Sequence, residues 1–360
     1  MMSNKIHVLA LGKYGELAAS SRQRMVQYLR PLEELGIILN FEPLLPDSYV
    51  EALAHSRGGQ SGVILQSYLR RVRRLLSVRD FDLVWVHCDL LPYVPGSLEM
   101  CFLSADTPIV YDCDDAIFHN YDLHRNALVR RLLSRKLEPL LRRCRAGTCG
   151  NDYLKAYVEQ FCAGSVVVPT VVDTQRYLMR TEAAVQTSSP VKIGWIGSPS
   201  TWAYVKPLFA ILEDLKAQTQ ITFHAIGVGE KDRTNAEFEF VDWALETEVS
   251  EIQKLDVGIM PLTDDPWSRG KCGFKLIQYM ACGLPVVASP VGVNRKLVKH
   301  GENGFLASTE QEWISALSTL IAEPALRTRM GAAGRALVER EYSLQSQVPR
   351  VADILRSAVS

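Results

Sequence analysis

The segment from Asp256 to Gly292 constrains the fold of this chain more than any other stretch of its 360 residues. Short apolar runs at Val257–Met260 and Leu284–Ala288 have the length and composition of buried strands. Between them, the apolar pattern of Phe274–Ala281 predicts a short helix. Two buried strands joined through a helix are typical of a parallel sheet, so the segment predicts an α/β fold.

The loop before the predicted helix combines cations with glycines. It contains Arg269, Gly270, Lys271 and Gly273, and Lys275 follows in the first turn of the helix. Glycines let the backbone approach a ligand, and the free N–H groups and dipole of a helix N-terminus favour negative charge. Lys271 and Lys275 are four residues apart, so both could reach a diphosphate at this helix start. The loop therefore predicts a diphosphate site, and the alternative is a surface loop with scattered cations.

The same segment resembles a block of a known family. Residues 275–288 read KLIQYMACGLPVVA, which is similar to the K-x-x-E-Y-M-A-x-G-x-P-V-V block of glycosyltransferase family 4. Members of that family are retaining, nucleotide-sugar-dependent enzymes of the GT-B fold. The resemblance implies two Rossmann-like domains that face each other across a cleft, with a C-terminal helix crossing back to the N-terminal domain. Gln278 stands where the family usually has a glutamate.

Length and charge narrow the class of protein. A chain of 360 residues is large for one core and natural for two domains. Its 40 basic and 40 acidic residues balance, so nucleic acid is not an expected partner. The eight cysteines form no C-x-x-C pair and no metal-ligand spacing, which favours a reducing, cytoplasmic location. Without a signal-peptide layout or a membrane-spanning run, we expect a soluble or peripheral protein.

Two series of strands alternate with helices along the chain. The first has predicted strands at 6–11, 81–87, 108–112 and 166–168 and helices at 22–35, 63–76, 128–141 and 152–160. The second has strands at 191–196, 222–227, 238–241, 257–260 and 284–288, followed by helices at 310–321, 325–341 and 344–358. With the resemblance, this order predicts an acceptor domain at 1–175, a nucleotide-sugar donor domain at 190–342 and a returning helix at 343–360. The polar residues from Thr181 to Pro190 form the expected linker.

The turn after the first predicted strand is a second place for a ligand. Gly12 and Gly15 can let this turn come close to a bound molecule. In similar proteins the loop sits under the donor diphosphate or the acceptor. Arg22 and Arg24 cannot share a helical face well, so we expect one of them to point into the cleft. The alternative is an ordinary strand-to-helix turn with solvated arginines.

Three carboxylates follow one another closely in the sequence Tyr111-Asp112-Cys113-Asp114-Asp115. Like charges at this spacing are costly unless cations or a function compensate them. The family often has a histidine-aspartate pair here, but a subgroup carries Y-D-x-D-D, which this chain matches. We assign Asp114 and Asp115 to hydrogen bonds with sugar or acceptor hydroxyls and to base assistance. The carboxylates alone would also suit Mg²⁺, whereas the GT-B resemblance implies a metal-independent site.

The second series opens on another turn suited to phosphate. Residues 194–202 read GWIGSPSTW, a strand, a glycine turn and hydroxyl residues before a helix. Gly197, Ser198 and Thr201 can offer N–H and hydroxyl donors to phosphate oxygens. The family commonly has an arginine and a lysine here, so the positive charge should instead come from the cations within residues 269–275.

The resemblance also implies a mechanism, in which the sugar is transferred with retention of configuration and usually without a protein nucleophile. Negative charge then grows on the leaving diphosphate, where pre-placed donors stabilise it. Arg269, Lys271 and the N–H groups of Gly270–Phe274 fit that task. Gln278 takes the place of the carboxylate that holds the ribose hydroxyls in the family, and its amide can both accept and donate. Gly270 stands where the family's first glutamate would contact the sugar.

Two arginine-rich stretches, Arg70–Arg74 and Arg130–Arg145, fall on predicted helices of the first domain. They could form a patch for an anionic surface on the inner membrane face or for a polyanionic acceptor. The alternative is that these helix faces are simply solvated. Many members of the family act on lipid-linked acceptors, which keeps peripheral membrane contact among our predictions.

These observations together predict a retaining glycosyltransferase of the hexosyltransferase type. It would move a sugar from a nucleoside diphosphate sugar, with UDP-sugar favoured over GDP-sugar, to a glycan, lipid-linked or small-molecule hydroxyl. We expect no permanently bound cofactor and no metal. A second hypothesis is a catalytically silent nucleotide-sugar-binding homologue that serves as a partner subunit. A third, a nicotinamide-dependent oxidoreductase, conflicts with the absence of G-x-G-x-x-G in the first loop.

Overall fold

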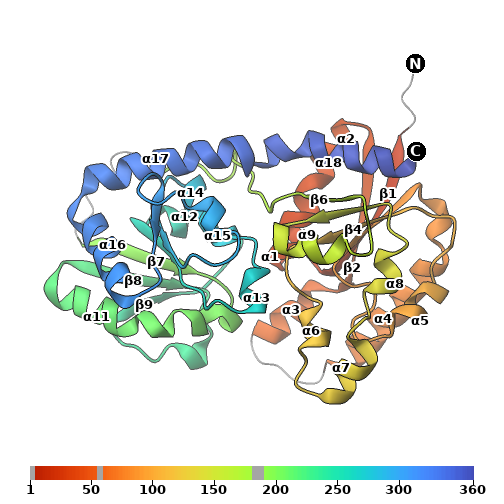
Figure 1. Ribbon diagram of the computed structural model, residues 1–360, viewed down its shortest axis with the longest axis horizontal. Helices are drawn as coiled ribbons and strands as arrows, with labels where there is room; N and C mark the ends of the chain where they lie inside the picture. Colours follow the sequence, from red (N-terminus) through yellow and green to blue (C-terminus); the bar gives the residue numbers. More distant parts are fainter. Residues whose placement is uncertain (1–4, 55–59, 181–189) are drawn as a thin grey trace. The chain divides into compact units, whose positions relative to one another are not determined.

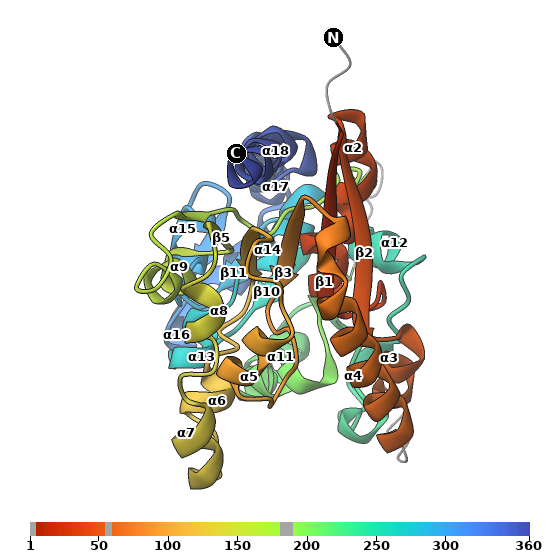
Figure 2. The ribbon, with the colours of Figure 1, turned by 90° about the vertical axis from the view of Figure 1, so that its right-hand side faces the viewer.

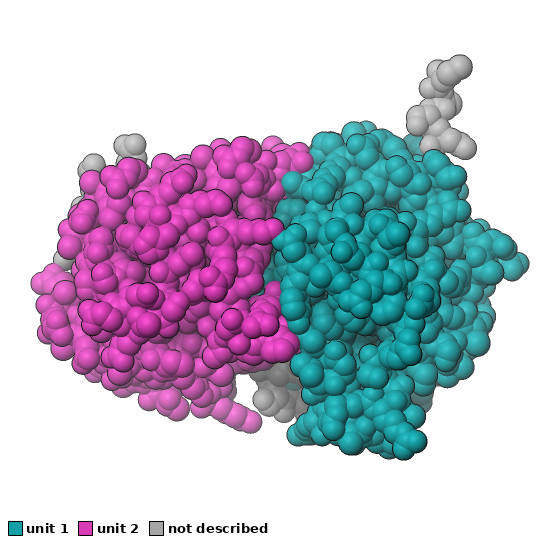
Figure 3. Space-filling view, in the orientation of Figure 1, with its two compact units in different colours: residues 1–170, 270–272, 347–360 teal, residues 171–269, 273–346 magenta. Residues whose placement is uncertain are grey.

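The computed structural model describes residues 5–54, 60–180 and 190–360 of the chain. Residues 181–189 of the expected linker lie outside the described residues. Contacts within the chain divide it into two compact units, which Figure 3 shows in different colours. The first unit contains residues 1–170, 270–272 and 347–360, and the second contains residues 171–269 and 273–346. The functional domains expected at 1–175, 190–342 and 343–360 remain a prediction.

The first unit is built on a six-stranded parallel sheet (Figure 1). In the spatial order β2-β1-β3-β4-β5-β6, its strands are β1 (Ile6–Tyr14), β2 (Ile37–Leu45), β3 (Leu83–His87), β4 (Ile109–Cys113), β5 (Ala146–Cys149) and β6 (Ser165–Val167). Every residue of β3 and β4 is buried, as expected of strands covered on both faces. Because neighbouring strands pair in parallel, their carboxyl ends meet at one edge of the sheet.

Two strands of this sheet have no clear signal in the sequence. β2 contains Asn40, Glu42 and Pro43, which strands usually avoid. The proline is tolerated because β2 is an edge strand, where one side of the backbone forms no ladder bonds. β5 reads Ala-Gly-Thr-Cys and is held by its pairing with β4 and β6 rather than by its own propensity.

Helices flank the sheet of the first unit (Figure 2). They are α1 (Ala19–Arg24), η1 (Val26–Tyr28), α2 (Leu29–Glu34), α3 (Asp47–Ala54), α4 (Ser61–Leu76), η2 (Val78–Asp80), α5 (Gly96–Cys101), α6 (His119–Asp122), α7 (Ala127–Leu133), α8 (Glu138–Leu141) and α9 (Asp152–Val158). The helices predicted at 22–35 and 128–141 are each interrupted, and both interruptions have the same cause. Pro31 lies in the first turn of α2 and Pro139 in that of α8, where the missing N–H of proline costs no helical hydrogen bond.

The second unit contains another six-stranded parallel sheet, in the order β12-β11-β10-β7-β8-β9. Its strands are β7 (Val191–Ile196), β8 (Ile221–Ile226), β9 (Phe238–Val241), β10 (Val257–Met260), β11 (Val286–Ala288) and β12 (Gly304–Leu306). The predicted bounds of β7, β9 and β10 are confirmed residue by residue, and β11 begins two residues later than predicted, after Pro285.

The helices of the second unit are η3 (Pro199–Tyr204), η4 (Lys206–Leu208), α11 (Phe209–Gln218), η5 (Glu230–Asp232), α12 (Glu248–Gln253), α13 (Pro266–Arg269), α14 (Phe274–Ala281), α15 (Asn294–Leu297), α16 (Glu310–Ala322) and α17 (Pro324–Glu341). α14 has the predicted bounds. α16 begins with a capping box, in which the Thr309 hydroxyl accepts the N–H of Glu312 and the Glu312 carboxylate accepts the N–H of Thr309.

The last helix, α18, runs from Leu344 to Val359, and its residues from 347 onward belong to the first unit. There Arg356 Nη2 donates to the carbonyl oxygen of Leu35 at 2.7 Å. Arg145 Nη1 donates to the carbonyl oxygen of Ala358 at 3.0 Å. Among the described residues, no helix combines the length and the apolar character that crossing a bilayer requires.

Candidate functional site

The turn after β1 is closely packed against its own unit. A Cβ atom on Gly12 would lie 2.8 Å from Cε2 of Phe41, and one on Gly15 would collide with the Asp47 carboxylate. Asp47 Oδ1 accepts the backbone N–H of Leu17 at 2.9 Å, which holds the turn in place. Both glycines are therefore needed for packing, and their contact with a ligand stays a prediction.

The first carboxylate of the Asp112–Asp115 cluster is structural. Arg24 is 3% exposed and donates to Asp112 twice, from Nε to Oδ2 at 2.9 Å and from Nη2 to Oδ1 at 2.5 Å. Thr148 Oγ1 adds a bond to Asp112 Oδ1 at 2.5 Å, and Arg24 Nη1 reaches the carbonyl oxygen of Val168 at 2.8 Å. Arg22 is buried as well. Both arginines of α1 are thus used inside the first unit, and Arg24 fixes α1 to β4.

Asp114 lies beside His87, a histidine that is not among the predicted site residues. His87 ends β3, in register with Asp112 of β4, and its Nε2 is 3.0 Å from Asp114 Oδ1. Burial alone would lower the pKa of His87, but Cys88 and Asp114 beside it hold that pKa well above its usual range. Burial alone would raise the pKa of Asp114, but His87 lowers it. The pair is therefore an imidazolium and a carboxylate at neutral pH.

Asp115 forms an ion pair with a cation of the predicted diphosphate loop. Lys271 Nζ lies 2.7 Å from Asp115 Oδ2, and the two side chains are 20% and 27% exposed. Burial raises the pKa of Asp115, and Lys271 opposes that shift. Two residues that the sequence assigns to catalysis are thus brought together in one partly exposed pair.

Residues 270–272, which belong to the first unit, are held there by two backbone carbonyl oxygens and by the Cys272 thiol. Asn151 Nδ2 donates to the carbonyl oxygens of Gly270 and Lys271, both at 3.0 Å. The Cys272 thiol donates to the carbonyl oxygen of Asp114 at 3.0 Å. His87 and Asn151 are not predicted from the sequence. His87 ends a predicted buried strand, and that position could have identified it, whereas Asn151 follows β5, a strand without a clear signal in the sequence.

In the second unit, the Lys275 side chain contacts the turn after β7. Lys275 Nζ donates to Thr201 Oγ1 at 3.1 Å and lies 4.6 Å from the centroid of the Trp195 ring. A Cβ atom on Gly197 would lie only 2.7 Å from this Nζ, so glycine leaves room for the cation. Thr201 Oγ1 also donates to the carbonyl oxygen of Ser198 at 3.0 Å. The structure therefore brings four predicted site residues together, namely Gly197, Ser198, Thr201 and Lys275.

Helix α14 begins at Phe274, directly after Gly273. Gly273 has a φ of +69°, a left-handed conformation that residues with side chains rarely adopt. Gly273, as the residue that precedes the helix, offers no side-chain hydrogen bond to the N–H groups of the first turn. The preceding cation, Arg269, pairs with Asp264 through Nε and Oδ1 at 2.7 Å, with both side chains about half exposed.

Gln278 is buried inside the second unit, with 2% of its surface exposed. Its Nε2 donates to the Tyr177 hydroxyl at 3.0 Å. Tyr177 donates to Glu248, which also accepts the Trp243 indole N–H at 2.7 Å. The amide nitrogen of Gln278 is thus occupied by a structural network, and the predicted contact with ribose hydroxyls remains untested.

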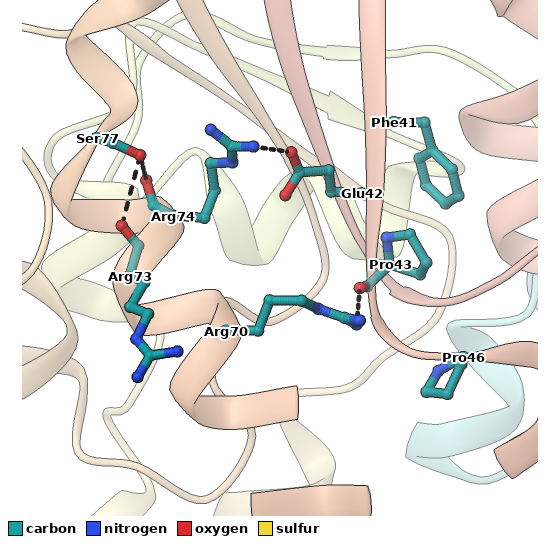
Figure 4. A pocket seen from close by; sticks show the side chains of 8 residues that line it. All are labelled: Phe41, Glu42, Pro43, Pro46, Arg70, Arg73, Arg74 and Ser77. Carbon is teal, nitrogen blue, oxygen red and sulfur yellow. Dashed lines mark hydrogen bonds and ion pairs between the residues drawn. The ribbon is translucent and has the colours of Figure 1, made fainter. Parts of the chain in front are cut away.

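The basic stretch Arg70–Arg74 lies on α4 beside the edge strand β2 (Figure 4). It lines an open groove of about 530 Å³ whose lining residues are Phe41, Glu42, Pro43, Pro46, Arg70, Arg73, Arg74 and Ser77. Arg74 pairs with Glu42 at 2.6 Å, and Arg70 Nη2 donates to the Pro43 carbonyl oxygen at 3.2 Å. Much of this stretch is therefore used to hold α4 against β2.

The stretch that begins at Arg130 has a different character. On and just before α7, three leucines are largely exposed: Leu123 by 57%, Leu128 by 60% and Leu132 by 65%. Arg125 and Arg131 stand beside them and have no ion-pair partner in the part of the chain that the structure describes. Figures 1 and 2 show α7 at one extremity of the first unit. From Leu123 to Leu137 the sequence contains no acidic residue.

Comparisons with known proteins relate this chain to glycosyltransferases. Residues 190–323 match the family model described as glycosyl transferases group 1. Over 238 residues the chain is 25% identical to the putative teichuronic acid biosynthesis glycosyltransferase TuaH of Bacillus subtilis, a match that covers 59% of this chain and 58% of TuaH. Over 86 residues it is 34% identical to a GDP-mannose-dependent monoacylated alpha-(1-6)-phosphatidylinositol monomannoside mannosyltransferase of Corynebacterium glutamicum, covering 24% of this chain and 23% of that protein. Each match spans less than two thirds of the relative.

A solved structure resembles the whole chain. It is that of Anabaena Alr3699/HepE in complex with UDP and glucose, with a TM-score of 0.71 and 16% identity, covering 98% of this chain and 100% of that chain. At this level of identity the likeness shows the fold. The predicted GT-B class, with two parallel-sheet α/β domains, is confirmed.

Proposed function

We propose that this protein is a retaining glycosyltransferase that moves a sugar from a UDP-sugar to a hydroxyl acceptor. The family match over residues 190–323 and the GT-B fold support glycosyl transfer. The main support is the position of Lys275 at the turn after β7. Its Nζ lies against Gly197 and donates a hydrogen bond to Thr201. That arrangement joins a cation, a hydroxyl and a tight glycine turn, which are the groups that bind a diphosphate.

In the proposed reaction, the donor diphosphate binds to the Gly197–Thr201 turn, to Lys275 and to the first N–H groups of α14. As the anomeric C–O bond breaks, negative charge grows on the diphosphate, and these donors stabilise it without reorganising. A diphosphate oxygen takes the proton of the acceptor hydroxyl on the same face of the sugar, which retains the configuration. Because the cations neutralise the leaving group, the reaction needs no metal.

Residues of the first unit are proposed to serve the sugar and the acceptor. Asp114 is held as a carboxylate by His87, with Oδ1 and Nε2 3.0 Å apart, so it can accept hydrogen bonds from sugar or acceptor hydroxyls. Lys271 and Asp115 neutralise each other at 2.7 Å. We infer that the donor diphosphate competes for Lys271 and thereby frees Asp115 for a hydroxyl. Arg269 can leave Asp264 in the same way, because both side chains are about half exposed.

The nucleotide is proposed to be uridine diphosphate, with guanosine diphosphate as the alternative. Alr3699/HepE is described in complex with UDP, and the mannosyltransferase relative is named as GDP-mannose-dependent. Thermal unfolding in the presence of UDP, GDP, ADP and their sugars tests both. A ligand at a hundred times its dissociation constant adds about 2.7 kcal/mol of stability, which is several degrees in the melting temperature. If no nucleoside diphosphate shifts the melting curve, the donor site is refuted.

The second candidate function is that of a catalytically silent homologue that binds a nucleotide sugar, and the environment of Gln278 is the observation that favours it. Position 278 carries an amide whose nitrogen is already bonded to Tyr177, where a carboxylate would bind ribose hydroxyls more strongly. A donor-hydrolysis assay with the nucleotide sugar that binds best separates the two functions. Release of free sugar above the uncatalysed rate, lost in Asp114→Asn, indicates an enzyme. Tight binding with no release in either protein, on any acceptor, indicates the silent homologue.

The acceptor is proposed to be a glycan or a lipid-linked molecule, with the first unit touching an anionic membrane surface. TuaH is named for teichuronic acid biosynthesis, and the other relative is named a phosphatidylinositol monomannoside mannosyltransferase. The exposed leucines of α7, beside Arg125 and Arg131, suit insertion among anionic headgroups. We expect sedimentation with anionic vesicles but not with zwitterionic ones. Leu128→Glu with Leu132→Glu should abolish it, whereas Leu65→Glu on α4 serves as a matched exposed control.

A further inference from the structure

A cysteine, a histidine and an aspartate converge at the carboxyl ends of β3 and β4. His87 is the last residue of β3, Cys88 follows it, and Asp114 lies directly after β4. Cys88 Sγ is 3.4 Å from His87 Nε2 and 3.9 Å from Asp114 Oδ1, and His87 Nε2 is 3.0 Å from Asp114 Oδ1. Within the described part of the chain, this is the group of His, Cys, Asp or Glu whose ligand atoms are close enough to share one ion.

These separations match those of a metal site. In tetrahedral Zn²⁺ coordination, with bonds of about 2.0 Å to nitrogen or oxygen and about 2.3 Å to sulfur, neighbouring ligand atoms lie about 3.3–3.5 Å apart. The observed separations of 3.0, 3.4 and 3.9 Å scatter around that range. Small side-chain rotations, without a backbone change, would therefore place all three atoms around one ion.

The backbone at Cys88 gives an independent reason to expect a function for its side chain. Cys88 has a φ of +66°, the left-handed region that favours glycine. Non-glycine residues in this conformation are strained and concentrate at active sites and ligand clamps. Glycine at this position would relieve the strain but would remove the thiol from His87 and Asp114.

The chemistry of the three groups selects the kind of ion. A thiolate and an imidazole suit Zn²⁺, whereas Mg²⁺ prefers oxygen ligands throughout. His87 and Cys88 are 2% and 5% exposed, and the Asp114 side chain is 13% exposed. Three protein ligands with one partly open side leave a position for water, as in zinc sites that are not purely structural.

We propose that His87 Nε2, Cys88 Sγ and Asp114 Oδ1 form a binding site for Zn²⁺ or a similar soft divalent cation. On binding, the Cys88 thiol and the His87 imidazolium each release a proton to solvent, and the three groups exchange their mutual hydrogen bonds for bonds to the ion. The bound ion would then occupy the Asp114 carboxylate, which in the proposed glycosyl transfer accepts a hydroxyl. Zn²⁺ should therefore inhibit transfer reversibly, and this expected inhibition rests on the proposed function.

Cobalt(II) is a spectroscopic probe for such a site, since it replaces zinc in the same ligands. Titration of the full-length, metal-stripped protein with Co²⁺ should produce the near-ultraviolet absorption of a thiolate–cobalt bond, and Zn²⁺ should remove it. Cys88→Ser should abolish that absorption and weaken Zn²⁺ binding at least about 100-fold, more than loss of a supporting residue costs. Cys101→Ser, which removes an exposed cysteine, is the matched control and should change neither.

Each outcome decides the proposal. The proposed metal site is overturned if no thiolate signal appears. It is also overturned if the signal persists in Cys88→Ser and disappears in Cys101→Ser. Should Cys88→Ser fail to fold in a thermal-unfolding control, His87→Gln and Asp114→Asn test the other two ligands with the same readout. A thiolate signal with the expected variant pattern supports the site even when the metal-free protein transfers no sugar, in which case only the proposed function fails.

Discussion

Replacing Lys275 with alanine is the most direct test of the donor site. The change removes a cation that bonds to Thr201 at 3.1 Å and lies 4.6 Å from the Trp195 ring centroid. If Lys275 binds the donor diphosphate, the variant loses one charge-assisted hydrogen bond, which contributes about 1.5–3 kcal/mol. That range corresponds to a UDP dissociation constant about 10- to 150-fold higher.

The cost to folding should be smaller. A cation over an aromatic ring in a partly exposed position contributes about 0.5–1 kcal/mol, and the Thr201 hydroxyl can bond to water instead. We therefore expect the free energy of unfolding to fall by about 1 kcal/mol. The binding loss should exceed the stability loss.

Calorimetric titration with UDP and unfolding in urea measure the two quantities on the same protein. Lys254→Ala is the matched control, because Lys254 is 55% exposed and pairs with Glu251 at 2.6 Å on the surface of the same unit. This control should leave both quantities nearly unchanged. If Lys275→Ala binds UDP as tightly as the wild type, or loses stability as much as affinity, Lys275 is structural and does not bind the donor diphosphate.

The remaining predictions concern stability, pH and the glycine turn. Asp112→Asn should lower the free energy of unfolding by about 3–5 kcal/mol in urea, because Arg24 is left buried without its charge partner; a loss below 1 kcal/mol would contradict that role. Burial raises the pKa of Glu99 from 4.5 to about 7, although Lys136 opposes the shift. The folded protein therefore holds this proton more tightly than the unfolded chain, and its stability should fall as the pH rises from about 4.5 through about 7. Glu99→Gln should flatten this dependence by up to about 1.4 kcal/mol for each pH unit, and an unchanged pH profile would exclude Glu99 as its source. Gly197→Ala should weaken UDP binding while unfolding remains cooperative, since its Cβ would lie 2.7 Å from Lys275 Nζ; unaltered UDP affinity in a titration would show that the turn does not contact the nucleotide.

The secondary structure was predictable where local pattern and tertiary context agree. β7, β9, β10 and α14 have the predicted bounds because short apolar runs between turn residues leave little alternative to burial. β2 and β5 escaped prediction for the opposite reason. Pro43 is acceptable only on an edge strand, and Ala146–Cys149 becomes a strand only between two neighbours. Neither condition can be read from a local stretch of sequence.

The candidate site shows the same division. Gly197, Thr201 and Lys275 were predicted from the sequence as phosphate-binding residues, and the structure places them together. Their chemistry, a glycine turn with a hydroxyl and a cation near a helix start, is visible in single short segments. The pairing of Lys271 with Asp115 and of Asp114 with His87 was not, since the partners lie 156 and 27 residues apart. His87 and Asp114 meet because β3 and β4 run side by side in parallel, so their carboxyl ends coincide. Lys271 meets Asp115 because residues 270–272 fold with the first unit, although the residues on either side of them belong to the second.

By itself, the sequence therefore determined the class of fold, the two series of strands and the kinds of residue that are proposed to bind a diphosphate. These properties depend on local periodicity and on the chemistry of single side chains. The tertiary structure decided which charge faces which partner: Asp112 is buried against Arg24, Asp115 forms a partly exposed ion pair with Lys271, and Asp114 lies beside His87 and Cys88. Charge pairing acts through space over a few ångströms, so only the folded chain separates the structural carboxylate of Asp112 from those of Asp114 and Asp115, which are proposed to bind hydroxyls.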